Sequence, residues 1–100
     1  MKRRQVIYTA DAAEDLEAIY DMVAQANHPE VAARYEQRIR DFCDALAYGA
    51  ERGSLRDDIR PNLRVIGFER RISVAFAVEG DLVIVLRLFY GGRDWEPDLR

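Results

Sequence analysis

The sequence predicts a single α+β domain over residues 1–100, with an N-terminal strand, a two-helix antiparallel hairpin and then a three-stranded antiparallel sheet. Two patterns support this class. In the first half of the chain, apolar residues recur at the spacing of amphipathic helices, whereas the second half contains three apolar segments separated by turn sequences. The length suits one domain with a modest core, and 49% of the residues are hydrophobic.

The first elements are a short strand at residues 5–8 and an amphipathic helix. Asp11 is followed three residues later by Glu14, a pattern that favours a helix start. The apolar stripe that follows has helical spacing and comprises Leu16, Ile19, Tyr20 and Val23. We interpret the acids between these positions as the solvated face of the helix: Asp15, Glu17 and Asp21.

A second helix follows the break at residues 27–29. Pro29 suits the first helical turn, where its missing N–H would be unpaired anyway, and Gly49 can end a helix that runs to about Tyr48. The apolar stripe of this helix comprises Tyr35, Ile39, Phe42 and Leu46. Cys43 lies beside the stripe, and we interpret it as a buried apolar residue rather than a nucleophile. Two helices with so short a connection should form a hairpin.

The second half contains a loop at residues 50–62 and strands at residues 63–68, 72–78 and 82–90. A three-residue turn at 79–81 would pair Val78 with Leu82. In that register one apolar face packs on the helices: Ile72, Val74, Phe76, Val78, Leu82, Ile84, Leu86 and Leu88. The opposite face holds Ser73, Ala75, Ala77, Val83, Val85, Arg87 and Phe89. No third helix is predicted to cover this second face, and exposed apolar surface of this kind usually marks a partner site.

The last strand contains one charged residue, Arg87, in an otherwise apolar segment. A guanidinium in that setting is costly unless it is paired or meets an anionic surface. The strand ends at Tyr90, and two glycines separate this tyrosine from Arg93. Backbone freedom, a phenol and a second guanidinium are therefore expected together after the strand.

Charge is unevenly distributed along the chain. The formal net charge of −3 does not suggest a general nucleic-acid coat protein. Residues 1–51 contain ten acids and six bases, whereas residues 52–71 contain six arginines and three acids. Arginine favours planar, bidentate contacts with carboxylate or phosphate, so the second half could meet an anionic partner. The alternative is an ordinary solvated charged face.

Several other functions are not supported by the residues present. One cysteine and one histidine cannot build a zinc site of the usual type within one chain, and an internal disulfide is excluded. The phosphate-binding loop and dinucleotide glycine patterns are absent. No apolar segment is long enough for a signal peptide or a membrane span. We therefore expect a cytoplasmic protein without metal or cofactor.

The order and spacing of several segments resemble the ParE branch of the RelE/ParE toxins of bacterial type II toxin–antitoxin systems. The resemblance covers nearly the whole chain. The segments that carry it are residues 13–20, then Pro29, Ala33, Tyr35, Ile39 and Leu46, then residues 53–64, and finally Leu86, Arg87 and residues 90–94. The fold of that family, a strand, a helical hairpin and a three-stranded antiparallel sheet, agrees with the fold predicted from the residues.

The resemblance implies a small toxin that a ParD-like antitoxin holds silent and that inhibits DNA gyrase, without being an enzyme, when it is released. The residues expected to contact the target are Arg87, Tyr90, Arg93 and Trp95. The antitoxin is expected to bind the arginine-rich loop and the second sheet face, through Arg56, Arg60, Arg64, Ala75, Val83, Val85 and Phe89. Neither a membrane partner nor sequence-specific DNA binding by this chain is expected.

Two alternatives remain open. Toxins of the RelE branch cut mRNA on the ribosome with basic side chains and an aromatic or histidine group, and Arg64, Arg87 and Tyr90 roughly match such positions. The match is incomplete, because the loop and second strand lack a lysine and Tyr90 stands where histidine is frequent. Arginine stays protonated and is a poor general base. The second alternative is an inactive interaction domain.

Overall fold

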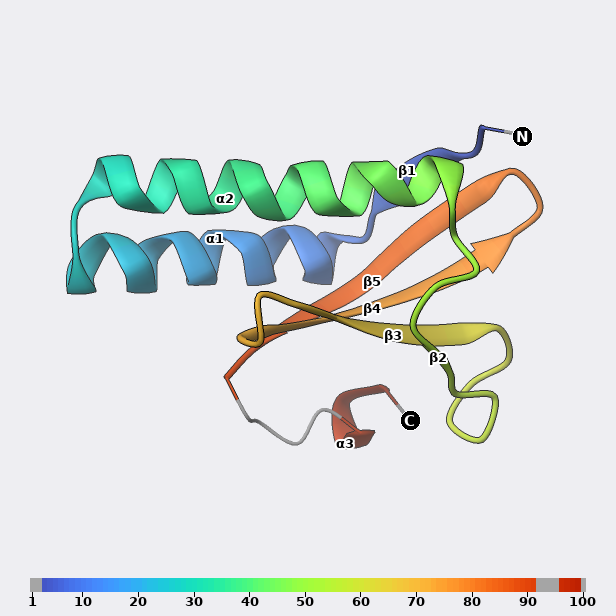
Figure 1. Ribbon diagram of the computed structural model, residues 1–100. Helices are drawn as coiled ribbons and strands as arrows, with labels where there is room; N and C mark the ends of the chain where they lie inside the picture. Colours follow the sequence, from blue (N-terminus) through green and yellow to red (C-terminus); the bar gives the residue numbers. More distant parts are fainter. Residues whose placement is uncertain (1–2, 92–95, 100) are drawn as a thin grey trace.

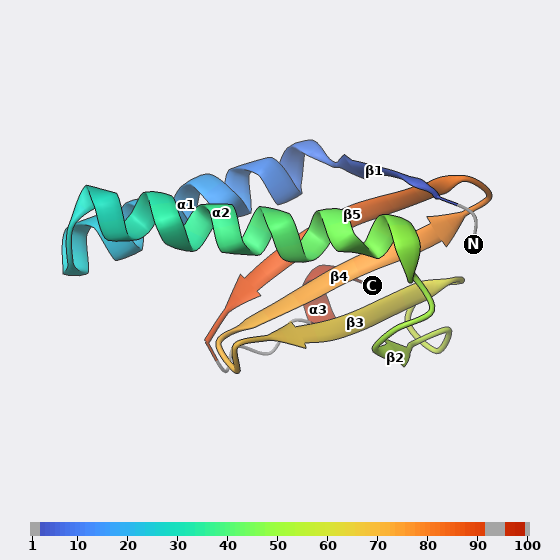
Figure 2. The ribbon, with the colours of Figure 1, turned by 45° about the horizontal axis from the view of Figure 1, so that its top comes forward.

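The computed structural model describes residues 3–91 and 96–99 (Figure 1). Its helices are α1 (Ala10–Ala26), α2 (Pro29–Asp44), the 3-10 helix η1 (Ala45–Tyr48) and α3 (Glu96–Leu99). Its strands are β1 (Gln5–Tyr8), β2 (Ser54–Leu55), β3 (Leu63–Phe68), β4 (Ile72–Glu79) and β5 (Leu82–Tyr90). Helices α1 and α2 form a hairpin over one face of the sheet, and α3 lies on the other side (Figures 1 and 2). The α+β class and the helical hairpin are as predicted.

The sheet contains five strands within the described residues, so the prediction of a three-stranded sheet was wrong. The strand order is β1-β5-β4-β3-β2. Strand β1 pairs in parallel with β5, with Gln5 opposite Leu82 and Tyr8 opposite Val85. Strand β2 pairs antiparallel with β3. The strand at residues 5–8 was predicted, but its place in the sheet was missed because it pairs with a distant segment. Strand β2 is too short to show a period.

Strand β2 lies within the segment predicted as a loop, and Gly53 lets it approach β3. This glycine has φ +77°, and a Cβ there would lie 2.4 Å from the carbonyl oxygen of Val65. A side chain at this position would therefore clash with the β3 backbone. The backbone N–H of Arg56 then donates to the carbonyl of Leu63 at 2.7 Å, which closes the loop.

The turn between β4 and β5 contains two residues rather than three. Gly80 has φ +58°, which suits the first central position of a type II′ turn. Val78 consequently lies opposite Val83, and the predicted pairing of Val78 with Leu82 is wrong. A one-residue slip exchanges the two faces of a strand. Val83 and Val85 therefore point toward the helices, where both are fully buried.

A β-bulge then changes the register again. The pairing of β4 with β5 shifts between Ala75 and Phe76, so that Val74 lies opposite Leu88. The bulge places one extra residue on β5. Leu88 consequently faces the helices as predicted, and Tyr90 lies on the same side. Alternation alone could not reveal the bulge, because β5 is apolar on both faces.

Helix α1 begins before the predicted start. Thr9 is its N-cap, and its hydroxyl oxygen accepts a hydrogen bond from the Ala12 N–H at 3.0 Å. Asp11 is therefore not the cap but an acid in the first turn, where it complements the helix dipole. The Thr9 hydroxyl also donates to the carbonyl of Leu86 at 2.8 Å. One side chain thus starts α1 and ties it to β5.

The main core lies between the hairpin and the sheet. Its buried residues are Ala12, Leu16, Ile19, Tyr35, Ile39, Cys43, Leu46, Ala50, Ile72, Val74, Phe76, Val83, Val85 and Leu88. Burial raises the pKa of the Cys43 thiol to about 12, so the thiol stays protonated near neutral pH. The predicted burial of Cys43 is confirmed.

A second apolar cluster lies on the other face of the sheet. Leu63, Ala75, Phe89 and Leu99 are buried in it, and Leu99 comes from α3. The C-terminal segment therefore covers part of the face that was predicted to have no helix over it. A four-residue helix is too short to show helical spacing in the sequence, so this cover could not be found from periodicity.

Candidate functional site

Strand β5 extends beyond β1, and the start of α1 protects the edge that β1 leaves open. The described pairing with β1 ends at Val85. Three residues further on, the backbone N–H of Leu88 donates to Oδ2 of Asp15 at 2.9 Å. A side-chain carboxylate thus replaces a strand partner at this position.

Arg87 binds the same carboxylate with both arms of its guanidinium. Nε donates to Oδ2 of Asp15 at 2.7 Å, and Nη2 donates to Oδ1 at 3.1 Å. The two side chains are only 21% and 17% exposed. The guanidinium also lies 4.9 Å from the centre of the Phe89 ring. The hydrogen bond to Asp15 raises the pKa of Arg87 further above its ordinary value. The charge that looked anomalous in the sequence is paired within the chain.

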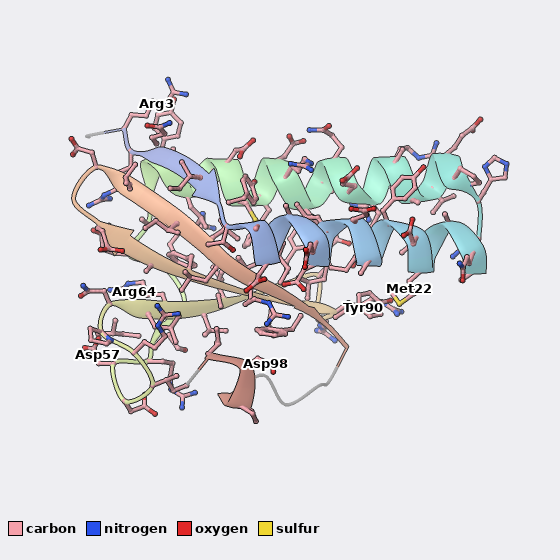
Figure 3. All side chains as sticks on the ribbon, turned by 180° about the vertical axis from the view of Figure 1, so that it is seen from behind. Arg3, Met22, Asp57, Arg64, Tyr90 and Asp98 are labelled. Carbon is pink, nitrogen blue, oxygen red and sulfur yellow. The ribbon has the colours of Figure 1, made fainter. Side chains whose placement is uncertain are left out.

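The three residues of the ribonuclease alternative do not converge. Arg64 lies opposite Phe76 on β4, whereas Tyr90 lies opposite Ile72 on the same strand. Four residues correspond to roughly 13 Å along a strand, and β4 separates the two side chains across the sheet. Figure 3 shows Arg64 and Tyr90 well apart. Arg87 lies at the β5 edge with its guanidinium bound to a carboxylate. One scissile phosphate could not contact all three groups.

Tyr90 lies in a pocket at the tip of the helical hairpin. Its hydroxyl oxygen accepts a hydrogen bond from Nη1 of Arg71 at 3.3 Å, which raises the pKa of Arg71. The pocket has a volume of about 310 Å³ and is lined by Val23, Asn27, Val31, Tyr35, Arg38, Glu69, Arg71 and Tyr90. The tip of the hairpin and the ends of β4 and β5 therefore border an open pocket that combines apolar walls with several polar groups.

The arginine-rich loop is ordered by its own acids. Nε and Nη2 of Arg56 donate to the two carboxylate oxygens of Asp58 at 2.9 and 2.8 Å. Oδ1 of Asp57 accepts from the backbone N–H of Asn62, which has φ +66°. Arg60 is exposed. The loop thus mixes acids and arginines and does not form an unbroken basic surface.

Within the described residues, no helix is long and apolar enough to cross a membrane. The same part of the chain holds no cluster of three or more His, Cys, Asp or Glu side chains that could bind a metal ion.

Comparisons with known proteins decide the family. A sequence-family model described as the ParE toxin of a type II toxin–antitoxin system, parDE, matches residues 6–95. The chain belongs to this family. A chain of a solved structure described as a chromosomal ParDE TA system from P. aeruginosa is 31% identical in sequence to this chain. The structural match covers 89% of this chain and 97% of that chain, with a TM-score of 0.77. Comparison with the curated proteins finds no significant match. The resemblance stated from the sequence is confirmed.

The second sheet face of this ParE chain differs from the predicted antitoxin site. Ala75 and Phe89 are 0% and 1% exposed, in the cluster that contains Leu99. Val83 and Val85 lie on the opposite face beneath the helices, because the two-residue turn shifts the register. These four residues therefore offer no open surface in this conformation. The exposed large apolar side chains of the described part lie elsewhere, at Met22, Val31, Tyr48 and Leu55.

The predicted target-binding residues of this ParE chain are only partly placed. Arg93 and Trp95 lie outside the described residues. Arg87 lies at the β5 edge against α1, and Tyr90 lies in the pocket at the hairpin tip. These two side chains thus lie in different parts of the structure, although they are only three positions apart in the sequence.

Asp15 is the residue of this edge that we misassigned. We interpreted it as solvated, yet it binds both Arg87 and the Leu88 backbone. A signal was present in the sequence, because a guanidinium on an apolar strand is costly unless a carboxylate pairs with it or it meets an anionic surface. Helical spacing also places position 15 beside Leu16, at the border of the apolar stripe. Tyr35 and Arg71 of the pocket had no such signal.

Proposed function

We propose that this chain is a toxin that a ParD-like antitoxin holds silent in the cytoplasm, and that the free toxin inhibits DNA gyrase by binding to it. Membership of the ParE family supports the pairing with an antitoxin. The separation of Arg64, Arg87 and Tyr90 is the observation that favours binding over RNA cleavage.

A ribonuclease needs a proton-transfer group and phosphate-binding groups within reach of one bond. In this chain the Tyr90 hydroxyl accepts from Arg71, and the guanidinium of Arg87 is bound to Asp15. A binding inhibitor needs only a surface that its target can contact. We assign that surface to the end of β5 and the residues that follow, including Tyr90, Arg93 and Trp95.

The antitoxin contacts that remain in the proposal are Arg56 and Arg60 of the loop and Arg64 near the start of β3. Bidentate contacts between arginine and carboxylate suit an acidic antitoxin segment. The buried residues of the two sheet faces are left out of the contact set, because covering side chains would first have to move.

Purified toxin should inhibit ATP-dependent supercoiling of relaxed plasmid by DNA gyrase, and the antitoxin encoded beside it should restore the activity. Induction in cells should cause filamentation and an SOS response before translation stops. A toxin premixed with antitoxin is the control for non-specific inhibition. Rapid mRNA cleavage within translated regions, with gyrase supercoiling unaffected, would contradict the proposal.

Tyr90→Phe separates the two mechanisms. Phenylalanine keeps the ring and loses one hydrogen bond, worth about 1 kcal/mol, so gyrase inhibition should fall by no more than about fivefold. Loss of a proton-transfer group would instead reduce ribonuclease activity by roughly 10²–10⁴-fold. Tyr48→Phe, at an exposed tyrosine, is the matched control. Arg93→Ala should weaken inhibition more than Tyr90→Phe. A fall in toxicity of more than 100-fold in a folded Tyr90→Phe toxin, without a matching fall in gyrase inhibition, would favour the ribonuclease.

A further inference from the structure

The pocket at the hairpin tip contains a buried polar group without a partner. Tyr35, on α2, is 8% exposed, and its hydroxyl has no hydrogen-bond partner among the described residues. Burial, followed by the neighbouring Tyr90 and Glu69, raises the pKa of this phenol, so it stays protonated and can donate. Buried hydroxyls in proteins are nearly always hydrogen-bonded, so an orphaned one calls for an explanation.

Two further groups of the pocket also have hydrogens to donate. The Tyr90 oxygen already accepts from Arg71, so its own hydrogen remains for another acceptor. Arg71 carries five N–H donors and, within the described residues, forms no ion pair with a carboxylate. Tyr35, Tyr90 and the exposed Arg71 therefore line one pocket with hydrogens that, apart from the Arg71–Tyr90 bond, no acceptor among the described residues takes.

The one carboxylate that lines the pocket does not satisfy these donors. Both oxygens of Glu69 accept from Arg38, at 3.0 and 3.1 Å. That hydrogen bond lowers the pKa of Glu69, which therefore stays ionised and paired. The Arg38 guanidinium also lies 5.1 Å from the centre of the Tyr35 ring. The charge left over in the pocket is the positive charge of Arg71.

We propose that this pocket binds the side-chain carboxylate of an aspartate or glutamate from the antitoxin. Arg71 would pair with the carboxylate and the Tyr90 hydroxyl would donate to one of its oxygens. The Tyr35 hydroxyl is buried, so it would donate to the carboxylate after a small shift of the side chains that cover it. Val23 and Val31 form apolar walls that suit the methylene stem of such a side chain. This assignment rests on the proposed function, because it places one acidic anchor of the antitoxin at the hairpin tip.

Affinity of the antitoxin for four toxin variants tests the assignment. Tyr35→Phe and Arg71→Gln should each weaken binding by about 10-fold or more, because each removes a donor to a charged group. Arg70→Gln is the matched control, since it removes the same charge from the adjacent residue, which does not line the pocket. Tyr48→Phe controls for the loss of a phenol. Tyr35→Phe should not lower the stability of the free toxin and could raise it, because the hydroxyl is buried without a partner there.

Equal affinities for all four variants, or weaker binding that only follows lost stability, would overturn the inference. Titration with N-acetylglutamate α-amide tests the pocket independently of the antitoxin. Saturable shifts in the NMR signals of the Tyr35 ring and the Arg71 Nε–H are expected, and they should be absent with N-acetylglutamine α-amide or in Arg71→Gln. An identical response to both probes would overturn the inference. Failure of wild-type toxin to bind the antitoxin would instead reject the proposed function. The titration with N-acetylglutamate α-amide would then decide whether the pocket binds a carboxylate.

Discussion

Replacing Asp15 with alanine is expected to lower the free energy of unfolding by about 3 kcal/mol. The substitution removes the carboxylate that binds the part-buried Arg87 guanidinium directly, although Asp98 and Asp11 still act on it, and it removes the acceptor for the Leu88 N–H. Both groups would then have to find water in a part of the structure that the hairpin covers. For a domain of 100 residues, this loss corresponds to a fall in Tm of roughly 10–20 °C.

Urea and thermal unfolding would measure this effect. Asp21→Ala is the matched control, because Asp21 is an exposed acid on the same helix and should change stability by less than about 0.5 kcal/mol. The double variant Asp15→Ala/Arg87→Leu should be more stable than Asp15→Ala alone, since it removes the charge that has lost its directly bound carboxylate. If Asp15→Ala and Asp21→Ala have the same unfolding free energy, the Asp15 carboxylate does not stabilise the β5 edge.

The ion pair between Asp15 and Arg87 also affects how Arg87 variants must be interpreted. Arg87→Ala would remove the bidentate hydrogen bonds to Asp15 as well as any contact with a target, so a loss of toxicity would have two explanations. Arg93 is the better residue for testing target binding. Any toxicity measurement on an Arg87 variant should therefore be accompanied by its unfolding free energy.

The sequence predicted the elements whose patterns are local. Spacing of apolar residues gave α1 and α2, and β-branched and aliphatic segments gave β3, β4 and β5 close to their observed bounds. The interpretation of Cys43 as a buried apolar residue also depended only on its place beside a helical stripe, and the structure confirms the burial.

The remaining features depend on pairings between distant segments or on single residues. A two-residue turn at Gly80 and a bulge beside Phe76 decide which side of β5 faces the helices, and alternation cannot detect them in a strand that is apolar on both faces. For the candidate site, too, the feature with a local pattern was predictable and the pairing between distant segments was not. The need of Arg87 for a partner was visible in the sequence, whereas the identity of Asp15 as that partner required the packing of α1 on β5.

Replacing Leu99 with alanine is expected to destabilise the fold by about 2–3 kcal/mol. Leu99 is 3% exposed and packs with Leu63, Ala75 and Phe89 on the sheet face opposite the hairpin. Its truncation would leave a cavity and expose part of the Phe89 ring to water. Removal of residues 96–100 should be at least as destabilising, because it removes Leu99 together with the rest of α3 from this cluster.

Leu55→Ala provides the matched control for this substitution, since Leu55 is 50% exposed and its truncation should lower the unfolding free energy by less than about 1 kcal/mol. Urea unfolding of the two variants beside the wild type would measure the difference. If Leu99→Ala and Leu55→Ala are equally stable, α3 is not part of the folded core. If Leu99→Ala is less stable than Leu55→Ala, a C-terminal truncation would lose toxicity through unfolding as well as through lost target contacts. Single substitutions such as Arg93→Ala are then needed to test target binding by this segment.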